Sequence, residues 1–226
     1  MRLSRLVLNP LNRGLARAVA DLQRMHQLVM GGFDGGAGPA ARAGYKVLYR
    51  LEIDPYGGAL VLYVQSASAP NWSRLPAGIL ATLADRPNPE MRALTELDAV
   101  TAGRMARFRL RANPTRRVDT KSVDGQRRHG RRVPHRDDAR CIEWLVRKGQ
   151  VHGFDLVRGT AGQLDVTLIH EPVRRGRREG AALTLEGARF DGRLRITDPP
   201  AFRTAVIQGI GPGKAYGFGL LSFAPE

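Results

Sequence analysis

Cysteine, long apolar runs and acidic residues are all scarce in this 226-residue sequence, and each scarcity excludes a class of protein. Cys141 is the single cysteine, so we expect neither an intrachain disulfide nor a cysteine cluster for zinc. No apolar run approaches the roughly 20 residues that cross a bilayer. Arg and Asn interrupt the opening MRLSRLVLNPLNRG, which argues against a signal peptide. The sequence therefore predicts a cytoplasmic protein without membrane partners.

The charge that is present is strongly positive and consists almost entirely of arginine. Lys and Arg total 36 against 21 acidic residues, a net charge of +15, and only four of these cations are lysines. Guanidinium groups suit phosphate and base recognition, although a GC-rich genome also favours arginine codons. Between Arg104 and Arg140, thirteen cations face four aspartates, a net charge of +9. We therefore expect a polyanionic partner to bind this segment.

The first 90 residues show a strand–helix–strand–strand–helix pattern. Alternation over residues 3–8 predicts a strand. Apolar residues at three- and four-residue spacing predict one helix over residues 15–29, which Gly31 ends. The remaining predictions for this half are a Gly/Ala-rich loop at 33–44, a hairpin of strands at 45–53 and 59–65, and a short helix at 77–83.

The second half repeats this pattern with extra strands. Residues 105–112 alternate as a strand, with Arg107, Arg109 and Arg111 on one face. Next come an Arg-rich flexible arm at 115–130, a helix at 138–148 capped by Asp137, paired strands at 154–157 and 164–169, a charged turn at 174–180, strands at 183–186 and 193–196, a helix at 199–206 and a strand at 217–223. The two patterns predict an α+β protein of tandem ferredoxin-like (RRM-like) domains, 1–90 and 91–226.

The tail GIGPGKAYGFG, residues 209–219, is the most specific local signal. Glycine permits backbone conformations in which successive N–H groups converge on a phosphate, and Lys214 adds charge at the same place. The segment is not a Walker loop, because it lacks Gly-Lys-Ser/Thr and leads into a predicted strand. A tight helix-to-strand turn would explain the glycines equally well.

Several segments together resemble the Repeat-Associated Mysterious Protein superfamily, and most of all its CasE branch. The tail GIGPGKAYGFGLLSFAP is similar to that superfamily's C-terminal glycine-rich loop, and LSRLVLNP to its first strand. The block ending in Met25-His26 resembles its histidine-bearing first helix. FRLRANPTRR resembles its mid-chain strand, and RRVP followed by IEWLVRKGQVHGF resembles the next loop and helix. The likeness therefore covers most of the chain.

The CasE branch contains the endoribonucleases that mature CRISPR RNA for the type I-E Cascade complex. The resemblance implies two ferredoxin-like folds that bind a CRISPR repeat stem-loop and cut at its base. The ribose 2′-OH would attack the adjacent phosphate, leaving a 2′,3′-cyclic phosphate and a 5′-OH. Other Cascade subunits are the implied partners, and the chemistry needs neither a metal nor a small-molecule cofactor.

The resemblance identifies His26 as the catalytic histidine, since imidazole exchanges protons near neutral pH. Taken alone, a histidine between Leu22 and Val29 on an apolar stripe is more often a packed or surface residue. Close relatives often carry tyrosine three residues before this histidine, where this chain has Gln23. An amide cannot transfer a proton, so Gln23 would orient the RNA or His26. Arg24 or Lys214 would instead stabilise the charge of the pentavalent phosphorane.

RNA binding is expected along the basic segments, because A-form RNA is recognised through phosphates, 2′-OH groups and shape. The expected RNA-binding residues are Arg24, Arg127, Arg128, Arg131, Arg132, Arg158, Gly209, Gly211, Gly213, Lys214, Gly217 and Gly219. Trp72 is a candidate for base stacking, whereas Trp144 reads as core. The histidines other than His26 are scattered without carboxylates at ligand spacing, so no metal site is predicted.

Two rival functions stay open. Gln23 favours a catalytically weak or inactive RNA-binding Cascade subunit. The charge alone is also compatible with a basic ribosome- or DNA-associated protein.

Overall fold

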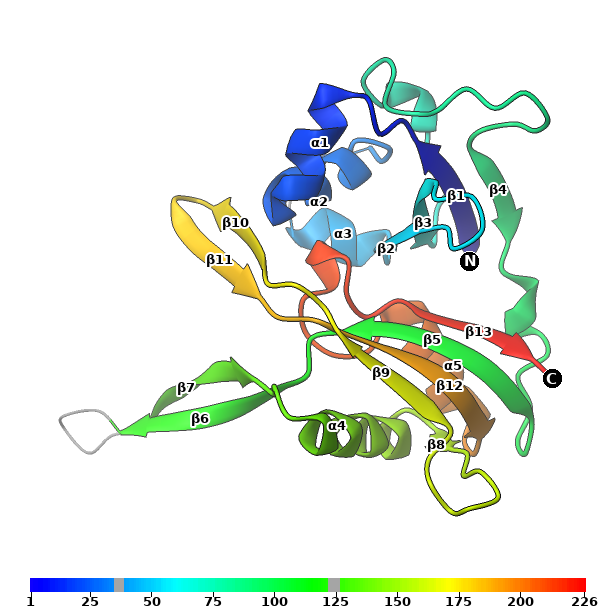
Figure 1. Cartoon of the computed structure of the whole chain (residues 1–226), viewed down its shortest axis with the longest axis vertical. Helices are drawn as coiled ribbons and strands as arrows, with labels where there is room; N and C mark the ends of the chain where they lie inside the picture. Colours follow the sequence, from blue (N-terminus) through cyan, green and yellow to red (C-terminus); the bar gives the residue numbers. More distant parts are fainter. Residues whose placement is uncertain (35–38, 122–126) are drawn as a thin grey trace.

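Two antiparallel sheets dominate the computed structural model, which describes residues 1–34, 39–121 and 127–226 (Figure 1). Figure 1 shows the first sheet and its helices in the upper half and the second sheet with its helices in the lower half. Each is an α+β unit with ferredoxin-like strand order, so the predicted fold class is confirmed. None of the helices in these described ranges is long and apolar enough to span a membrane.

The first sheet has the strand order β2-β3-β1-β4. Its centre is an antiparallel pair of β1 (Arg2–Leu8) and β3 (Leu60–Ser66), and its edges are β2 (Leu48–Ile53) and β4 (Glu90–Ala93). Because β4 pairs with β1, the first unit extends past residue 90. The division into two domains stays a proposal, and this pairing places the boundary after Ala93.

One face of the first sheet is covered by helices where the sequence predicted a single helix and a loop. They are α1 (Arg13–Ala20), α2 (Leu22–Met30) and α3 (Pro39–Gly44) (Figure 1). Asp21 separates the first two because its backbone is extended, with φ −130° and ψ 124°. Its carboxylate accepts a hydrogen bond from the Arg24 N–H at 2.9 Å, so Asp21 is the N-cap that starts α2.

The helix predicted at residues 77–83 is wrong. The chain there turns at Gly78, whose φ is +75°, and Leu80 makes an isolated antiparallel bridge with Leu8. A short 3-10 helix, η1 (Trp72–Arg74), precedes it. Positive φ is unfavourable in a right-handed helix, so the glycine decides the local structure here.

The second sheet has the order β13-β5-β12-β8, with β9 also on β12. The strands are β5 (Met105–Ala112), β8 (Phe154–Leu156), β9 (Val166–His170), β12 (Ala188–Ile196) and β13 (Leu221–Pro225). The predicted pairing of residues 154–157 with 164–169 is found only next to the turn, where the Asp165 N–H donates to the Val157 carbonyl at 2.8 Å; β8 and β9 themselves pair with successive parts of β12. The helices are α4 (Asp138–Val151), capped by Asp137 as predicted, and α5 (Pro199–Gln208).

Two hairpins stand outside the sheets, where the sequence predicted a flexible arm and a charged turn. One consists of β6 (Thr115–Lys121) and β7 (Arg127–Pro134), and the other of β10 (Arg174–Arg178) and β11 (Ala181–Leu185). In Figure 1 the β6–β7 hairpin projects away from the body, whereas β10–β11 reaches up to the helices of the first unit. β10 contacts both α1 and α2.

Each unit has its own apolar core, and the two tryptophans belong to them. Trp144 stacks on Phe190 with ring centroids 6.2 Å apart in the second core, as predicted. Trp72 is buried in the first core, edge-on to Phe33 at 5.9 Å. Its 4% exposure leaves no face for a base, so the stacking role predicted for Trp72 is wrong.

Candidate active site

His26 lies where α2 of the first unit meets the glycine-rich tail of the second. The helix buries Leu22, and it buries Met25 and Val29 in the first core; His26 lies between these last two with 4% of its surface exposed. Its imidazole faces the ring of Tyr216 edge-on, with centroids 6.1 Å apart and planes at 67°. The two residues are 190 positions apart, so only the docking of the two units brings them together.

Tyr216 is held by a short 3-10 helix within the tail, η3 (Lys214–Tyr216), which contacts α2 and β2. Gly213 and Gly217 flank this turn in the left-handed conformation, with φ of +82° and +83°. A Cβ on Gly217 would lie 3.0 Å from Cε2 of the buried Tyr49, whose Oη donates to the Ala215 carbonyl at 3.2 Å. The backbone of the tail and the β2 side chain therefore fix Tyr216 against α2.

Tyr216 also joins two polar partners. Its Oη donates to Gln23 Oε1 at 3.4 Å, and Gln23 lies one helical turn before His26 on the same face of α2. A hydrogen bond with Tyr216, followed by one with Glu179, raises the pKa of the Arg178 guanidinium. The sequence analysis missed both Tyr216 and Arg178. The sequence does contain one signal for Tyr216, because a tyrosine inside a glycine-rich loop can place its hydroxyl next to a bound ligand.

The β10–β11 hairpin brings further arginines to this place. Gly176 packs so closely on the start of α2 that an added Cβ would lie 3.0 Å from the Leu22 nitrogen. Arg174 Nη2 donates to the carbonyl of Val19, at the end of α1, at 2.6 Å. The segment that the sequence predicted as a charged turn is therefore the strand β10, which places its arginines beside the N-terminus of α2.

Lys214 lies in the same turn but faces a different group of charges. Burial, followed by the charges of Arg42 and Lys148, lowers the pKa of its ammonium group. Burial and then Lys148 and Lys214 lower the pKa of His152 in the same way. These neighbours come from α3, α4 and the tail, so a positive field surrounds this side of η3. A phosphate group is the kind of counter-charge that such a field attracts.

The glycines of the tail divide into two groups. The N–H groups of Gly209 and Gly219 donate to the carbonyls of Ala205 and Arg111 at 2.8 and 2.7 Å. Their predicted role as phosphate-binding N–H donors is therefore corrected to a structural one. That role stays a prediction for Gly211, Gly213 and Gly217.

The predicted RNA-binding residues Arg24, Arg132 and Arg158 do not lie on the face of α2 that carries His26. Arg24 is exposed and lies two residues before His26, which places it on another face of α2. Arg158 forms an isolated bridge with Leu164, which precedes β9, whereas β10 comes after the opposite end of β9. Arg132 is exposed on β7. Arg127, Arg128 and Arg131 belong to the same strand, but their side chains lie outside the described residues.

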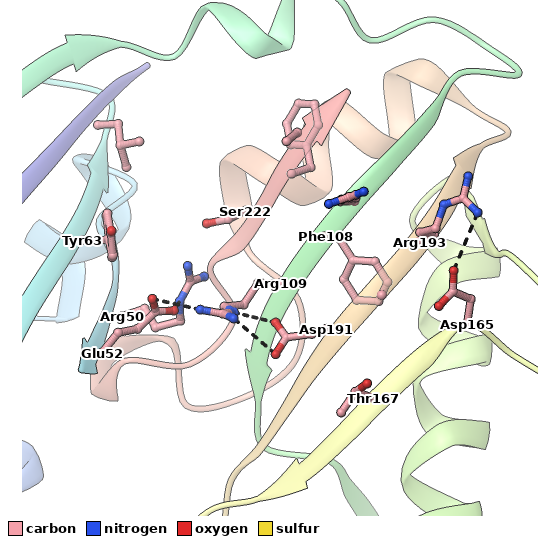
Figure 2. A pocket seen from close by; sticks show the side chains of 15 residues that line it. Arg50, Glu52, Tyr63, Phe108, Arg109, Asp165, Thr167, Asp191, Arg193 and Ser222 are labelled. Atoms are coloured by element: carbon pink, nitrogen blue, oxygen red, sulfur yellow. Dashed lines mark hydrogen bonds and ion pairs between the residues drawn. The ribbon is translucent and has the colours of Figure 1, made fainter. Parts of the chain in front are cut away.

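An open cleft of about 810 Å³ lies between the two sheets, away from His26 (Figure 2). Its arginines face carboxylates. Arg109 lies 2.5 Å from Asp191 and 3.2 Å from Glu52, and Arg193 lies 3.8 Å from Asp165. Because these charges are already paired, the cleft attracts a polyanion less strongly than do the cations around η3, which are Arg42, Lys148 and Lys214. We therefore place the candidate active site at His26 and Tyr216.

The residues described here do not form a metal site of the usual kind. Within residues 1–34, 39–121 and 127–226, no three or more His, Cys, Asp or Glu side chains gather as ligands for an ion.

Comparison with known proteins gives a consistent result. The model of the family described as "CRISPR associated protein" matches residues 1–225. The CRISPR-associated endoribonuclease Cse3 of Thermus thermophilus is 33% identical over 234 residues, covering 100% of both chains. The Cascade subunit CasE of Escherichia coli K12 is 38% identical over 122 residues, 52% of this chain and 57% of that protein. A solved Thermus thermophilus Cse3 bound to an RNA representing a pre-cleavage complex is similar, with a TM-score of 0.79, 31% identity and coverage of 99% and 98%.

Proposed function

The chain belongs to the CRISPR-associated protein family, and on that premise we propose that it is an endoribonuclease that cuts precursor CRISPR RNA at the base of the repeat stem-loop. The proposed activity is supported by the similarity of the whole chain to the endoribonuclease Cse3. The meeting of His26 with the glycine-rich tail at the junction of the units carries the location of the site. The family predicted from the sequence motifs is thus confirmed.

The chemistry of the site is proton transfer without a metal. The 2′-OH of the nucleotide before the cut attacks the adjacent phosphorus, and the 5′-oxygen of the next nucleotide leaves. His26 transfers one of the protons that this exchange requires, because imidazole gives and takes protons near neutral pH. His26 is 4% exposed before RNA binds, so the proposal requires the docked RNA to displace the groups that cover the imidazole.

Binding follows the basic surfaces that converge on this site. The arginines of β10 and the cations around η3 hold the phosphates next to the cut. The β6–β7 hairpin projects from the body and carries Arg132, so it extends along the stem (Figure 1). The product stays bound and passes with the protein into Cascade, whose other subunits are its partners. The location is cytoplasmic, where CRISPR transcripts are made.

The test is single-turnover cleavage of a repeat hairpin RNA in excess EDTA, with wild-type protein, His26→Ala and a control variant. His170→Ala is the control because His170 is an exposed histidine on β9, paired with Asp138. We expect His26→Ala to bind the hairpin and cut about 10²–10⁴-fold more slowly. His170→Ala should behave as wild type, and mass analysis should find a 2′,3′-cyclic phosphate. Equal cutting by His26→Ala and wild type would refute the site.

The alternative function is an RNA-binding Cascade subunit with weak or no cleavage activity, and Gln23 is the observation that favours it. In that case the wild-type protein would bind the hairpin in the same assay and leave it intact.

A further inference from the structure

Cleavage by 2′-OH attack requires two proton transfers, and His26 accounts for one of them. The attacking 2′-oxygen must lose its proton and the leaving 5′-oxygen must gain one. Gln23, one turn away on the same helix face, has no proton that it can transfer. A second acid–base group must therefore come from another element.

We propose that Tyr216 is this second catalytic residue and donates its Oη proton to the 5′-oxygen, while His26 accepts the proton of the 2′-OH. The inference rests on the proposed function and adds a residue to its mechanism. The ring centroids of Tyr216 and His26 lie 6.1 Å apart, so the two side chains are close enough to act on the two oxygens of one phosphodiester. A phenol ordinarily holds its proton at neutral pH, which is the form that a general acid needs.

The partners of Tyr216 fit an acid. Oη donates to Gln23 Oε1 at 3.4 Å, which is long for an O–H···O hydrogen bond, so the proton is held weakly and can be redirected to substrate. Arg178 lies beside the same phenol, and its interaction with Tyr216 raises the pKa of the guanidinium. Its guanidinium stabilises the phenolate that remains after the proton has left. Gln23 is then a positioning residue for Tyr216.

The step balances in atoms and charge. The O2′–H bond breaks as His26 gains a proton, and the O2′–P bond forms as the P–O5′ bond breaks. The Oη–H bond of Tyr216 breaks as the O5′–H bond forms. The products are a 2′,3′-cyclic phosphate and a 5′-hydroxyl, with an imidazolium and a phenolate that exchange a proton through water before another turnover.

The tail ensures that the phenol is in place before RNA binds. Gly213 and Gly217 hold η3 in a conformation that other residues rarely adopt, and Tyr49 anchors the turn through the Ala215 carbonyl. A preorganised acid loses little freedom in the transition state.

The experiment compares two RNA hairpins in single-turnover cleavage, one with the ordinary linkage and one with sulfur in place of the leaving 5′-oxygen. A thiolate leaves without protonation, so the second RNA does not need a general acid. We expect Tyr216→Phe to cut the ordinary RNA about 10²-fold more slowly with unchanged hairpin affinity. On the sulfur-containing RNA its rate should match wild type, whereas His26→Ala should stay slow on both.

Tyr56→Phe is the matched control, because Tyr56 is a tyrosine 99% exposed on the turn between β2 and β3, and its rate should equal wild type. Arg178→Gln provides a second variant on an exposed side chain, with a smaller loss that the sulfur substitution also restores. A normal rate of Tyr216→Phe on ordinary RNA would overturn the proposal, and so would failure of sulfur to restore it. A wild-type protein that cuts neither RNA would instead contradict the proposed function.

Discussion

Gly217→Ala should slow RNA cleavage by displacing Tyr216, although the substitution adds one methyl group outside the reacting atoms. Gly217 has a φ of +83°, where an L-residue is disfavoured by about 1–2 kcal/mol. The new Cβ would lie 3.0 Å from Cε2 of Tyr49, a ring 3% exposed. For that ring to yield, its hydrogen bond to the Ala215 carbonyl must loosen, which costs about 1 kcal/mol more.

These contributions predict a loss of about 2–3 kcal/mol in the free energy of unfolding and a fall in Tm of about 5–10 °C. The altered turn is the one that carries Tyr216, and a misplacement of about 1 Å costs about 10²-fold in rate. Thermal denaturation and single-turnover cleavage of the repeat hairpin, below the lowered Tm, measure the two effects separately.

Gly162→Ala is the control for Gly217→Ala. Gly162 has a φ of +84° but no atom within 4 Å of an added Cβ, so it carries the same backbone cost without the contact. We expect a loss of about 1–2 kcal/mol in stability and an unchanged cleavage rate. If Gly217→Ala cut RNA as fast as Gly162→Ala, the idea that this glycine positions the tyrosine would be refuted.

Three further predictions concern the surroundings of the site. Asp21→Ala removes the cap of α2 and should lower the free energy of unfolding by about 1 kcal/mol in a denaturant titration, whereas Asp21→Asn should be nearly neutral. Lys214→Met should make the slope of log affinity against log salt shallower by about 1 in hairpin titrations, and an unchanged slope would remove Lys214 from the RNA interface. Burial, followed by Asp138 and Asp137, raises the pKa of Cys141 to about 11, so the native thiol should resist iodoacetamide at pH 8. Rapid alkylation of the native protein, followed by mass spectrometry, would contradict this. The same shift makes stability depend on pH. Because the thiol of the unfolded chain loses its proton at a lower pH than the buried thiol does, the contribution of Cys141 to the free energy of unfolding should fall as pH rises from about 9 to 11.

The sequence predicted elements well where a local pattern is enough to determine them. The bounds of β5 agree with its alternating segment, and α4 starts after the predicted cap Asp137. Local reading failed at Asp21, because the apolar stripe continues through it while its side chain caps a new helix. It failed again at β10, whose charged sequence gives no strand signal and whose place is set by packing on α2.

By itself the sequence determined the fold class, the family, the identity of His26 as the candidate catalytic histidine and the excess of arginine. The fold class and the arginine excess follow from periodicity and composition, whereas the family and His26 follow from the resemblance of short motifs to a known family; all of these signals are properties of neighbouring residues. Only the tertiary structure decided that Tyr216, 193 residues from Gln23, contacts Gln23 and His26, and that Trp72 and the N–H groups of Gly209 and Gly219 serve the interior. The physical reason is that a contact between two units depends on how their surfaces dock, which no local pattern along one segment encodes.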